Sequence, residues 1–205
     1  MSLPPSVVAV ALDEVDDRWE AALSEHERAI YRSLSVEKRR RDWLGGRVAA
    51  KRAAQRQMAL PFPRLEVMAK SEGEDRGRPE LYVDGVLAGG FLSITHSHGL
   101  ALATYGDTPV GLDLERVEAR DHHFLELVFT EPERARLWAV PAEHRDQAIT
   151  AAWCRKEAYA KLLGLGLRAD FELLGAAEAL SFVQGTLQFG DATLCWALVE
   201  GKEAA

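Results

Sequence analysis

Two long segments with helical periodicity, residues 36–60 and 144–163, most strongly limit how this chain can fold. Short apolar runs that read as strands accompany each segment, and turn residues separate them. Because both halves combine one long helix with antiparallel strands, the pattern indicates a duplicated arrangement. We expect the join at residues 106–109, which begin with the turn signal Gly106-Asp107.

The apolar runs predict strands in both halves of the chain. In the first half they cover residues 7–12, 65–69, 81–83, 91–95 and 100–105, followed by 110–115 in the second. Residues 95–99 should form a hairpin tip between two of these strands. A further hairpin should turn at Gly185, before a last strand at 193–199, whereas 171–179 should be irregular.

Capping patterns mark the starts of two shorter helices. Ser24 and Glu27 form one capping box, and Thr130 and Glu133 form another. This structural role alone is enough to explain a glutamate at position 133. The long helices should end at Pro61 and at Gly164. A further helix is expected at 122–128.

The composition excludes several classes of protein. A net charge of -7 argues against a general nucleic-acid-binding surface. Cys154 and Cys195 form no CxxC pair, so neither a structural zinc site nor a disulfide framework is expected. The apolar run at residues 7–12 is too short for a signal segment or a membrane span. We therefore expect a cytoplasmic protein that meets its substrates in solution.

The stretch at residues 110–115, Val-Gly-Leu-Asp-Leu-Glu, carries two carboxylates on one strand face. Strand periodicity places Asp113 and Glu115 together, opposite the apolar residues. Two such carboxylates repel each other unless a cation lies between them. One interpretation is an exposed polar face; the other is a Mg²⁺ site, because Mg²⁺ prefers hard oxygen ligands.

The helix at residues 153–161 carries three different groups on one face. Trp153, Glu157 and Lys161 follow each other at intervals of four residues. Taken alone, Glu157 and Lys161 could be an ordinary solvated ion pair, and Trp153 an apolar anchor.

The predicted helix at residues 36–60 is locally basic in an acidic chain. Many of its cations should lie on a solvated face with their stems along the protein surface. The alternative is a cradle for phosphate groups. Arg47 is the best candidate for that role, because it follows Gly45-Gly46 and small neighbours let a bulky anion approach.

Three motifs stand in one order along the chain. They are Val-Gly-Leu-Asp-Leu-Glu at 110–115, Phe-Thr-x-x-Glu at 129–133 and Trp-x-x-Lys-Glu-Ala-x-x-Lys at 153–161. This set resembles the signature of the 4'-phosphopantetheinyl transferases, specifically their Sfp type. The resemblance extends to the basic helix with Gly46-Arg47, to Gly77-Arg78-Pro79 and to Thr95-His96-Ser97, so that it covers most of residues 36–167.

The resemblance implies an α+β fold class, with a pseudo-twofold duplication of two similar halves and the active site in the cleft between them. Residues 1–108 would hold the basic helix and the coenzyme A phosphate contacts. Residues 109–205 would hold the magnesium-binding carboxylates and the helix at 153–161. The shorter, trimeric members of the family have about half as many residues per chain, so we expect a monomer here.

The implied reaction moves 4'-phosphopantetheine from coenzyme A to a serine hydroxyl of an acyl or peptidyl carrier protein and releases 3',5'-ADP. By resemblance, the Mg²⁺ ligands would be Asp113, Glu115 and Glu157. Coenzyme A would be held by Arg47, Arg78, Thr95, His96, Lys156 and Lys161. Thr95 stands where the family more often has serine, and the hydroxyl is retained.

Several alternatives stay open at this stage. The general base could be Glu157, Glu133 or a metal-bound water. His96 and His98 could suggest a zinc site, but no third ligand has suitable spacing. A catalytically silent relative that only binds coenzyme A is a second functional hypothesis, and an acidic interaction protein with chance motifs is a third. The carrier protein served, whether for fatty acid, polyketide or nonribosomal peptide synthesis, carries no motif.

Overall fold

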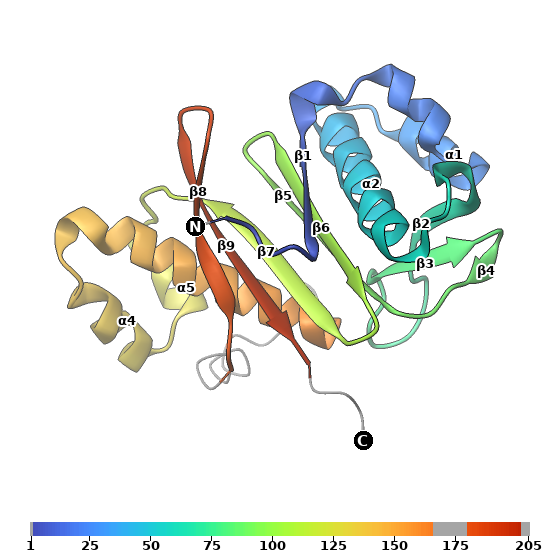
Figure 1. Ribbon diagram of the computed structural model, residues 1–205. Helices are drawn as coiled ribbons and strands as arrows, with labels where there is room; N and C mark the ends of the chain where they lie inside the picture. The colour runs from blue at the N-terminus through green and yellow to red at the C-terminus, as the bar shows by residue number, and fades with distance from the viewer. Residues whose placement is uncertain (1, 166–179, 202–205) are drawn as a thin grey trace.

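The computed structural model describes residues 2–165 and 180–201, which form a mixed α+β structure (Figure 1). The predicted α+β class is thereby confirmed. The first half contains β1 (Val7–Ala11), α1 (Glu25–Ser33), α2 (Glu37–Met58), β2 (Leu65–Ala69), β3 (Pro79–Val83), β4 (Val86–Leu87), β5 (Phe91–Ser97) and β6 (Leu100–Gly106). Short 3-10 turns lie at Leu12–Glu14, Asp17–Ala22 and Phe62–Arg64.

The second half contains β7 (Val110–Arg116), α3 (His122–Val128), α4 (Glu131–Trp138), α5 (Ala142–Leu163), β8 (Val183–Phe189) and β9 (Ala192–Glu200). Both long helices predicted from the sequence are present, and α5 ends at Gly164 in the left-handed conformation. Among the described residues, no helix is both long enough and apolar enough to cross a membrane.

Each half contains a three-stranded antiparallel sheet with the same pattern of connections. In the first, β1 pairs with β6 and β6 pairs with β5, whereas in the second β7 pairs with β9 and β9 pairs with β8. In both sheets, the first strand of the half (β1 or β7) pairs with the second strand of a hairpin (β6 or β9). A third small sheet, in the order β2-β3-β4, extends the first half.

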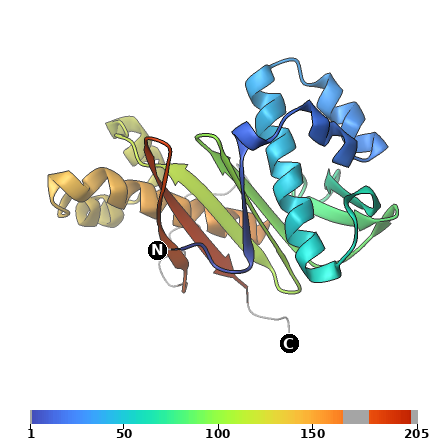
Figure 2. The same ribbon diagram turned by 45° about the horizontal axis from the view of Figure 1, so that its top comes forward.

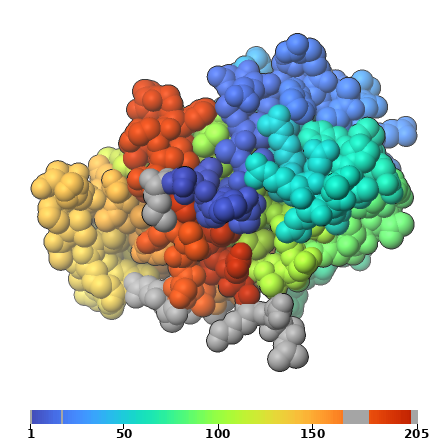
Figure 3. Space-filling view, in the orientation of Figure 1, coloured from blue at the N-terminus to red at the C-terminus, as the bar shows by residue number. Residues whose placement is uncertain are grey.

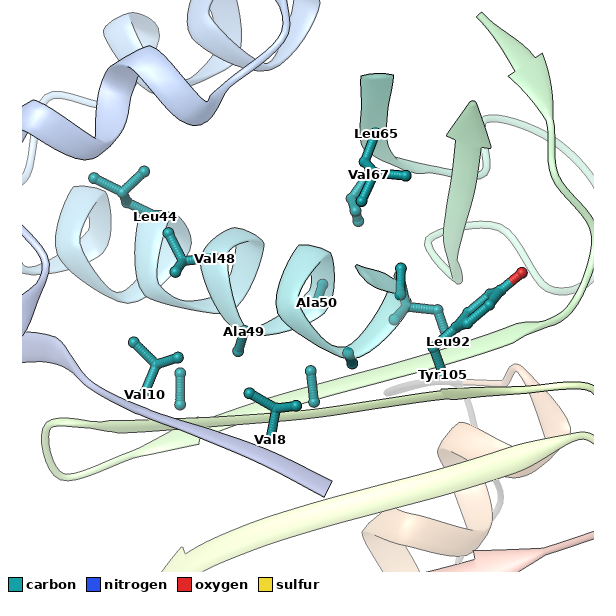
Figure 4. Close-up of a cluster of buried hydrophobic side chains, with 14 of the residues drawn as sticks. Val8, Val10, Leu44, Val48, Ala49, Ala50, Leu65, Val67, Leu92 and Tyr105 are labelled. Atoms are coloured by element: carbon teal, nitrogen blue, oxygen red, sulfur yellow. The ribbon is translucent and has the colours of Figure 1, made fainter. Parts of the chain in front are cut away.

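Helix α2 buries its small residues against the first sheet. Ala49 points towards Val8 and Val10 of β1 (Figure 4), and Ala53 belongs to the same cluster as Ala101 and Ala103 of β6. Alanine on both surfaces lets the helix lie close to the sheet. In the second half, α5 lies against β7 and β9, and Figures 1 and 2 show one long helix beside each sheet.

The alternate residues of β6 belong to a second cluster that joins the two halves. Leu100 and Leu102 pack with Leu112, Leu114 and Trp196, which come from β7 and β9. Strand β6 therefore packs one face against α2 and the other face against β7 and β9 of the second half, because successive side chains of a strand point to opposite faces. The space-filling view shows the N-terminal segment, in dark blue, lying across the middle of the molecule (Figure 3).

Strands β5 and β7 meet at this junction. The hydroxyl of Ser93 on β5 accepts a hydrogen bond of 2.9 Å from the backbone N–H of Leu112 on β7. Because β5 belongs to the first half and β7 begins the second, this contact brings residues of the two halves side by side.

The predicted hairpin of β5 and β6 is present, but its tip is shorter than expected, and the second hairpin prediction was wrong. Thr95 and His96 lie in β5, paired with Leu102 and Ala101, and the turn is formed by His98 and Gly99, both with positive φ. Gly185 lies inside β8 and not at a turn. A Cβ atom at Gly185 would approach the ring of Trp196 to 3.1 Å, so the glycine leaves space for the indole. The predicted irregular segment 171–179 lies outside the described residues.

Candidate functional site

Strand β7 is pressed against α5, and this contact creates the centre of the candidate site. A Cβ atom at Gly111 would lie 1.8 Å from the backbone oxygen of Ala158, so that only glycine allows the observed approach. The next residues of the strand alternate, and Asp113 and Glu115 take the side opposite Leu112 and Leu114, as predicted. The carboxylates are not on an exposed face, because Asp113 is only 3% accessible.

Asp113 is bonded by side chains from both halves. Its Oδ1 atom lies 2.7 Å from Lys161 Nζ on α5 and accepts a hydrogen bond of 3.1 Å from Thr95 Oγ1 on β5. Lys161 Nζ also donates to the backbone oxygen of Leu112, at 3.2 Å. The other oxygen of Asp113, Oδ2, is buried and has no hydrogen-bond partner.

Glu115 also receives two donors. Trp153 Nε1 on α5 donates to its Oε1 atom at 3.2 Å, and Arg120 Nη2 lies 3.4 Å from its Oε2 atom. Burial raises the pKa of Glu115, and the charge of Asp113 raises it further. Arg120 comes from the loop after β7, and no sequence motif pointed to its role.

Glu157 is the most perturbed acid of the group. Burial, followed by the charges of Asp113 and Glu115, raises its pKa from 4.5 to about 7, against the opposing effect of Lys161. All three carboxylates therefore act on one another electrostatically. They form an acidic cluster of Asp113, Glu115 and Glu157 beside the ammonium group of Lys161.

The acidic cluster offers the right atoms for Mg²⁺ but not a formed site. Its carboxylate oxygens are ligands that Mg²⁺ prefers, and the unpartnered Asp113 Oδ2 atom together with the mutual repulsion fits a bound cation. Yet no three acidic, histidine or cysteine side chains of the described residues gather as a metal-binding group. Side-chain donors hold the cluster in place: Lys161 and Thr95 bond to Asp113 Oδ1, and Trp153 and Arg120 bond to Glu115.

A hollow of about 490 Å³ lies between the start of α2 and the end of β5. Its polar lining includes Lys38, Arg39, Asp42, Arg47 and His96. Arg47 stacks over the ring of Trp43 at 4.3 Å, and its Nε atom is buried without a hydrogen-bond partner. Burial lowers the pKa of Arg47 to about 10, so the guanidinium stays charged near neutral pH.

His96 lines the hollow and lies on the face of β5 opposite to that of Thr95. Its side chain remains accessible, but the surrounding atoms displace enough water to lower its pKa, and both Lys38 and Lys161 act in the same direction. His98 instead contacts Asp191 in the turn between β8 and β9, at 3.4 Å. The two histidines thus have different surroundings, which does not favour the alternative zinc site.

Glu133 and Lys156 form a separate buried pair. Lys156 Nζ lies 2.8 Å from Glu133 Oε2, which also accepts hydrogen bonds from the backbone N–H and the hydroxyl of Thr130. The predicted capping box is therefore present. Burial would raise the pKa of Glu133, but the bonds from Lys156 and Thr130 outweigh this effect and lower it.

The sequence of this second half matches a known family. The sequence model of the 4'-phosphopantetheinyl transferase superfamily matches residues 109–200. The C-terminal half of the chain is therefore similar to this superfamily. The matched residues include all three motifs of the predicted resemblance, which is thereby confirmed.

The chain is also 28% identical over 122 residues to the 4'-phosphopantetheinyl transferase psf-1 of Bacillus pumilus. This alignment covers 60% of the chain and 49% of that relative, so the chain spans about half the length of the curated relative it matches.

The structure brings together some of the residues predicted from the family resemblance and not others. Thr95, Asp113 and Lys161 are in contact, and Glu115 and Glu157 act on them by charge. Arg47 and His96 line the hollow. Arg78 is not among the residues that line it; its guanidinium lies over the ring of Phe91, at the other end of β5, and within 4.0 Å of Asp75. Glu133 and Lys156 line a different hollow, between α4 and α5.

The raised pKa of Glu157 predicts how the stability of the metal-free protein depends on pH. Because the folded protein holds this proton up to about pH 7 and the unfolded chain releases it near 4.5, the free energy of unfolding should fall as pH rises through this window. The expected loss is on the order of 1–2 kcal/mol after allowance for partial solvent exposure. Urea denaturation at several pH values would measure it.

The matched comparison is Glu157→Gln, which removes the titrating group and should reduce this pH dependence. Glu143→Gln, an exposed position in the first turn of the same helix, should leave the dependence unchanged. Equal pH profiles for wild type and Glu157→Gln would contradict the assignment of a raised pKa to Glu157.

Proposed function

We propose that this protein transfers the 4'-phosphopantetheine group from coenzyme A to a serine hydroxyl of an acyl or peptidyl carrier protein. The observation that carries the proposal is the contact of Asp113 with both Lys161 and Thr95, together with a basic hollow lined by His96, the next residue of β5. Phosphoryl transfer depends mainly on positioning and on neutralising phosphate charge. A carboxylate cluster in contact with β5 and a cationic hollow lined by the same strand would meet both requirements.

The hollow would hold the phosphates of coenzyme A. Arg47 offers a buried Nε atom without a partner, and Lys38, Arg39 and His96 line the same space. A guanidinium fixed by stacking over Trp43 loses little freedom on binding an anion. Arg78 remains a proposed contact with coenzyme A from outside the hollow. Its buried Nη2 atom, which has no hydrogen-bond partner, supports that role.

Asp113, Glu115 and Glu157 would hold Mg²⁺. When bound, the ion would neutralise charge on the pyrophosphate oxygens. Lys161 would exchange its contact with Asp113 for one with a phosphate oxygen, because the cation would then balance the carboxylate. Lys156 is bonded to Glu133 and to the backbone oxygen of Val128, which suits a supporting role more than a phosphate contact.

In the transfer step, the serine oxygen forms a bond to the phosphorus that carries pantetheine. The bond from that phosphorus to the oxygen bridging the two phosphates breaks, and 3',5'-ADP leaves with the electron pair. The serine proton must pass to a base. Of Glu157 and Glu133, we assign this role to Glu157, directly or through water, because it belongs to the acidic cluster, whereas Glu133 is paired with Lys156. The lowered pKa of Glu133 makes it a weaker base.

The shared strand order of the two sheets supports a pseudo-twofold duplication with the site in the cleft between the halves. Contacts of Thr95 from β5 with Asp113 from β7 support the same location. We further propose that the protein acts as a cytoplasmic monomer of the holo-[acyl-carrier-protein] synthase class.

A direct test is labelling of apo carrier proteins with fluorescent coenzyme A, with and without Mg²⁺. A panel of carriers from fatty acid, polyketide and nonribosomal peptide synthesis should include at least one that is labelled only when Mg²⁺ is present. Absence of labelling across the panel, with the protein folded, would refute the transferase proposal. Tight binding of coenzyme A in calorimetry without turnover would favour the alternative, a catalytically silent relative.

Glu133→Gln is expected to reduce stability more than catalysis. Loss of its charge leaves the buried ammonium of Lys156 without a counter-ion, which should lower the free energy of unfolding by on the order of 3 kcal/mol. Activity per folded molecule should stay within a few-fold of wild type. Urea denaturation and carrier labelling measure the two effects, with the exposed Glu131→Gln as a control. Unchanged stability together with lost transfer would instead identify Glu133 as the base.

A further inference from the structure

The carboxylate of Glu115 is held at both oxygens by donors from different elements. Trp153 on α5 donates its indole N–H to Oε1, and Arg120 from the loop after β7 lies against Oε2. Arg120 is also paired with Glu118, at 3.1 Å, and so divides its charge between two carboxylates. Trp153 contributes a single donor of fixed direction. Of the two, the indole therefore defines more closely where Glu115 lies.

The indole ring of Trp153 is itself fixed by packing. It meets the ring of Phe124 edge to face, at a centroid distance of 5.4 Å and an angle of 76°. Its neighbours are the buried Leu125, Val128 and Ile149, from α3 and α5. A ring enclosed in this way cannot turn its N–H group away from Glu115 without disturbing the cluster. The direction of the donor is thus set by the core between α3 and α5.

We infer that Trp153 is a positioning residue for Glu115, which orients this carboxylate for a divalent cation. The inference rests on the proposed function, which assigns Asp113, Glu115 and Glu157 to the metal. Hydrogen bonds from surrounding residues commonly fix the orientation of metal-binding carboxylates, and their loss weakens metal binding. A carboxylate oxygen can accept more than one bond, so the indole leaves lone pairs on Glu115 for the cation.

An apolar anchor would not require the indole nitrogen. If Trp153 only filled space against Phe124, phenylalanine would serve nearly as well, and the contact with Glu115 would only satisfy a partly buried N–H group. The two roles differ in one measurable property. Only a positioning role makes cation binding sensitive to the loss of a single N–H donor while the aromatic packing remains.

The test compares Trp153→Phe with Trp138→Phe, which makes the same chemical change at a half-exposed position on α4. Mn²⁺, a paramagnetic substitute for Mg²⁺, is titrated into each protein with and without saturating coenzyme A. Free Mn²⁺ is followed by electron paramagnetic resonance. Trp153→Phe should bind Mn²⁺ about tenfold more weakly than wild type. Trp138→Phe should match wild type within about twofold.

The outcomes separate this inference from the proposed function. Equal Mn²⁺ affinity in wild type and Trp153→Phe would overturn the positioning role and leave the metal site intact. Failure of wild type to bind Mn²⁺ in either condition would overturn the metal assignment, and the inference with it.

A second measurement does not depend on the folding of Trp153→Phe. In protein labelled with ¹⁵N-tryptophan, added Mg²⁺ should shift one indole N–H resonance of the wild-type protein. The Glu115→Gln variant should show that same resonance displaced at the start and unresponsive to Mg²⁺. An indole resonance that is unaffected by Glu115→Gln would contradict the inference.

Discussion

Asp113→Asn should reduce the labelling of apo carrier proteins by about 10²- to 10³-fold. The substitution keeps the size of the side chain but removes the charge that faces Lys161 and acts on Glu157. It should therefore weaken cation binding, which acts against transfer. Steady-state labelling rates at increasing Mg²⁺ concentrations would measure the loss.

Asp107→Asn is the matched control for this experiment. Asp107 is exposed in the turn between β6 and β7, and its substitution should leave the labelling rate unchanged. Thermal unfolding of both variants checks that the fold is retained. A labelling rate for folded Asp113→Asn near that of wild type would refute its assignment to the site.

Gly111→Ala should greatly lower the free energy of unfolding, although it adds only one methyl group. The added Cβ would lie 1.8 Å from the backbone oxygen of Ala158 and 2.8 Å from its carbonyl carbon, where no flexible side chain can give way. Strand β7 and helix α5 would have to move apart, at a cost of at least about 3 kcal/mol. Urea denaturation would measure the change.

Gly106→Ala provides the comparison, because an added Cβ there meets only the end of Gln57, at 3.9 Å. Its effect on stability should be within about 0.5 kcal/mol. If Gly111→Ala were equally mild, close packing would not be the reason for the glycine in this motif.

The local chemistry of the site was largely predictable from the sequence. Alternation along 110–115 placed Asp113 and Glu115 on one side, and the four-residue spacing placed Trp153, Glu157 and Lys161 on one helix face. Both are properties of a single element, which short-range periodicity determines. The capping box at Glu133 was predictable for the same reason.

Contacts between distant segments could not be predicted in this way. The pair of Glu133 with Lys156 and the bond from Trp153 to Glu115 depend on how α4, α5 and β7 pack. Arg120 carries no motif, and its role appears only when its loop lies beside Glu115. Gly185 was misread because a glycine that makes room for an indole looks, in sequence, like one that forms a turn.

The meeting of β5 and β7 has a practical consequence for dissecting this protein. The residues that match the family, 109–200, contain the acidic cluster but not Thr95, His96 or Arg47. Cutting the chain in the turn before β7 would also divide the apolar cluster formed by Leu102 and Leu112. Two co-expressed fragments would each expose a surface that fits only the other. Their reassembly would offer a split reporter in which catalytic activity returns only when the two pieces meet.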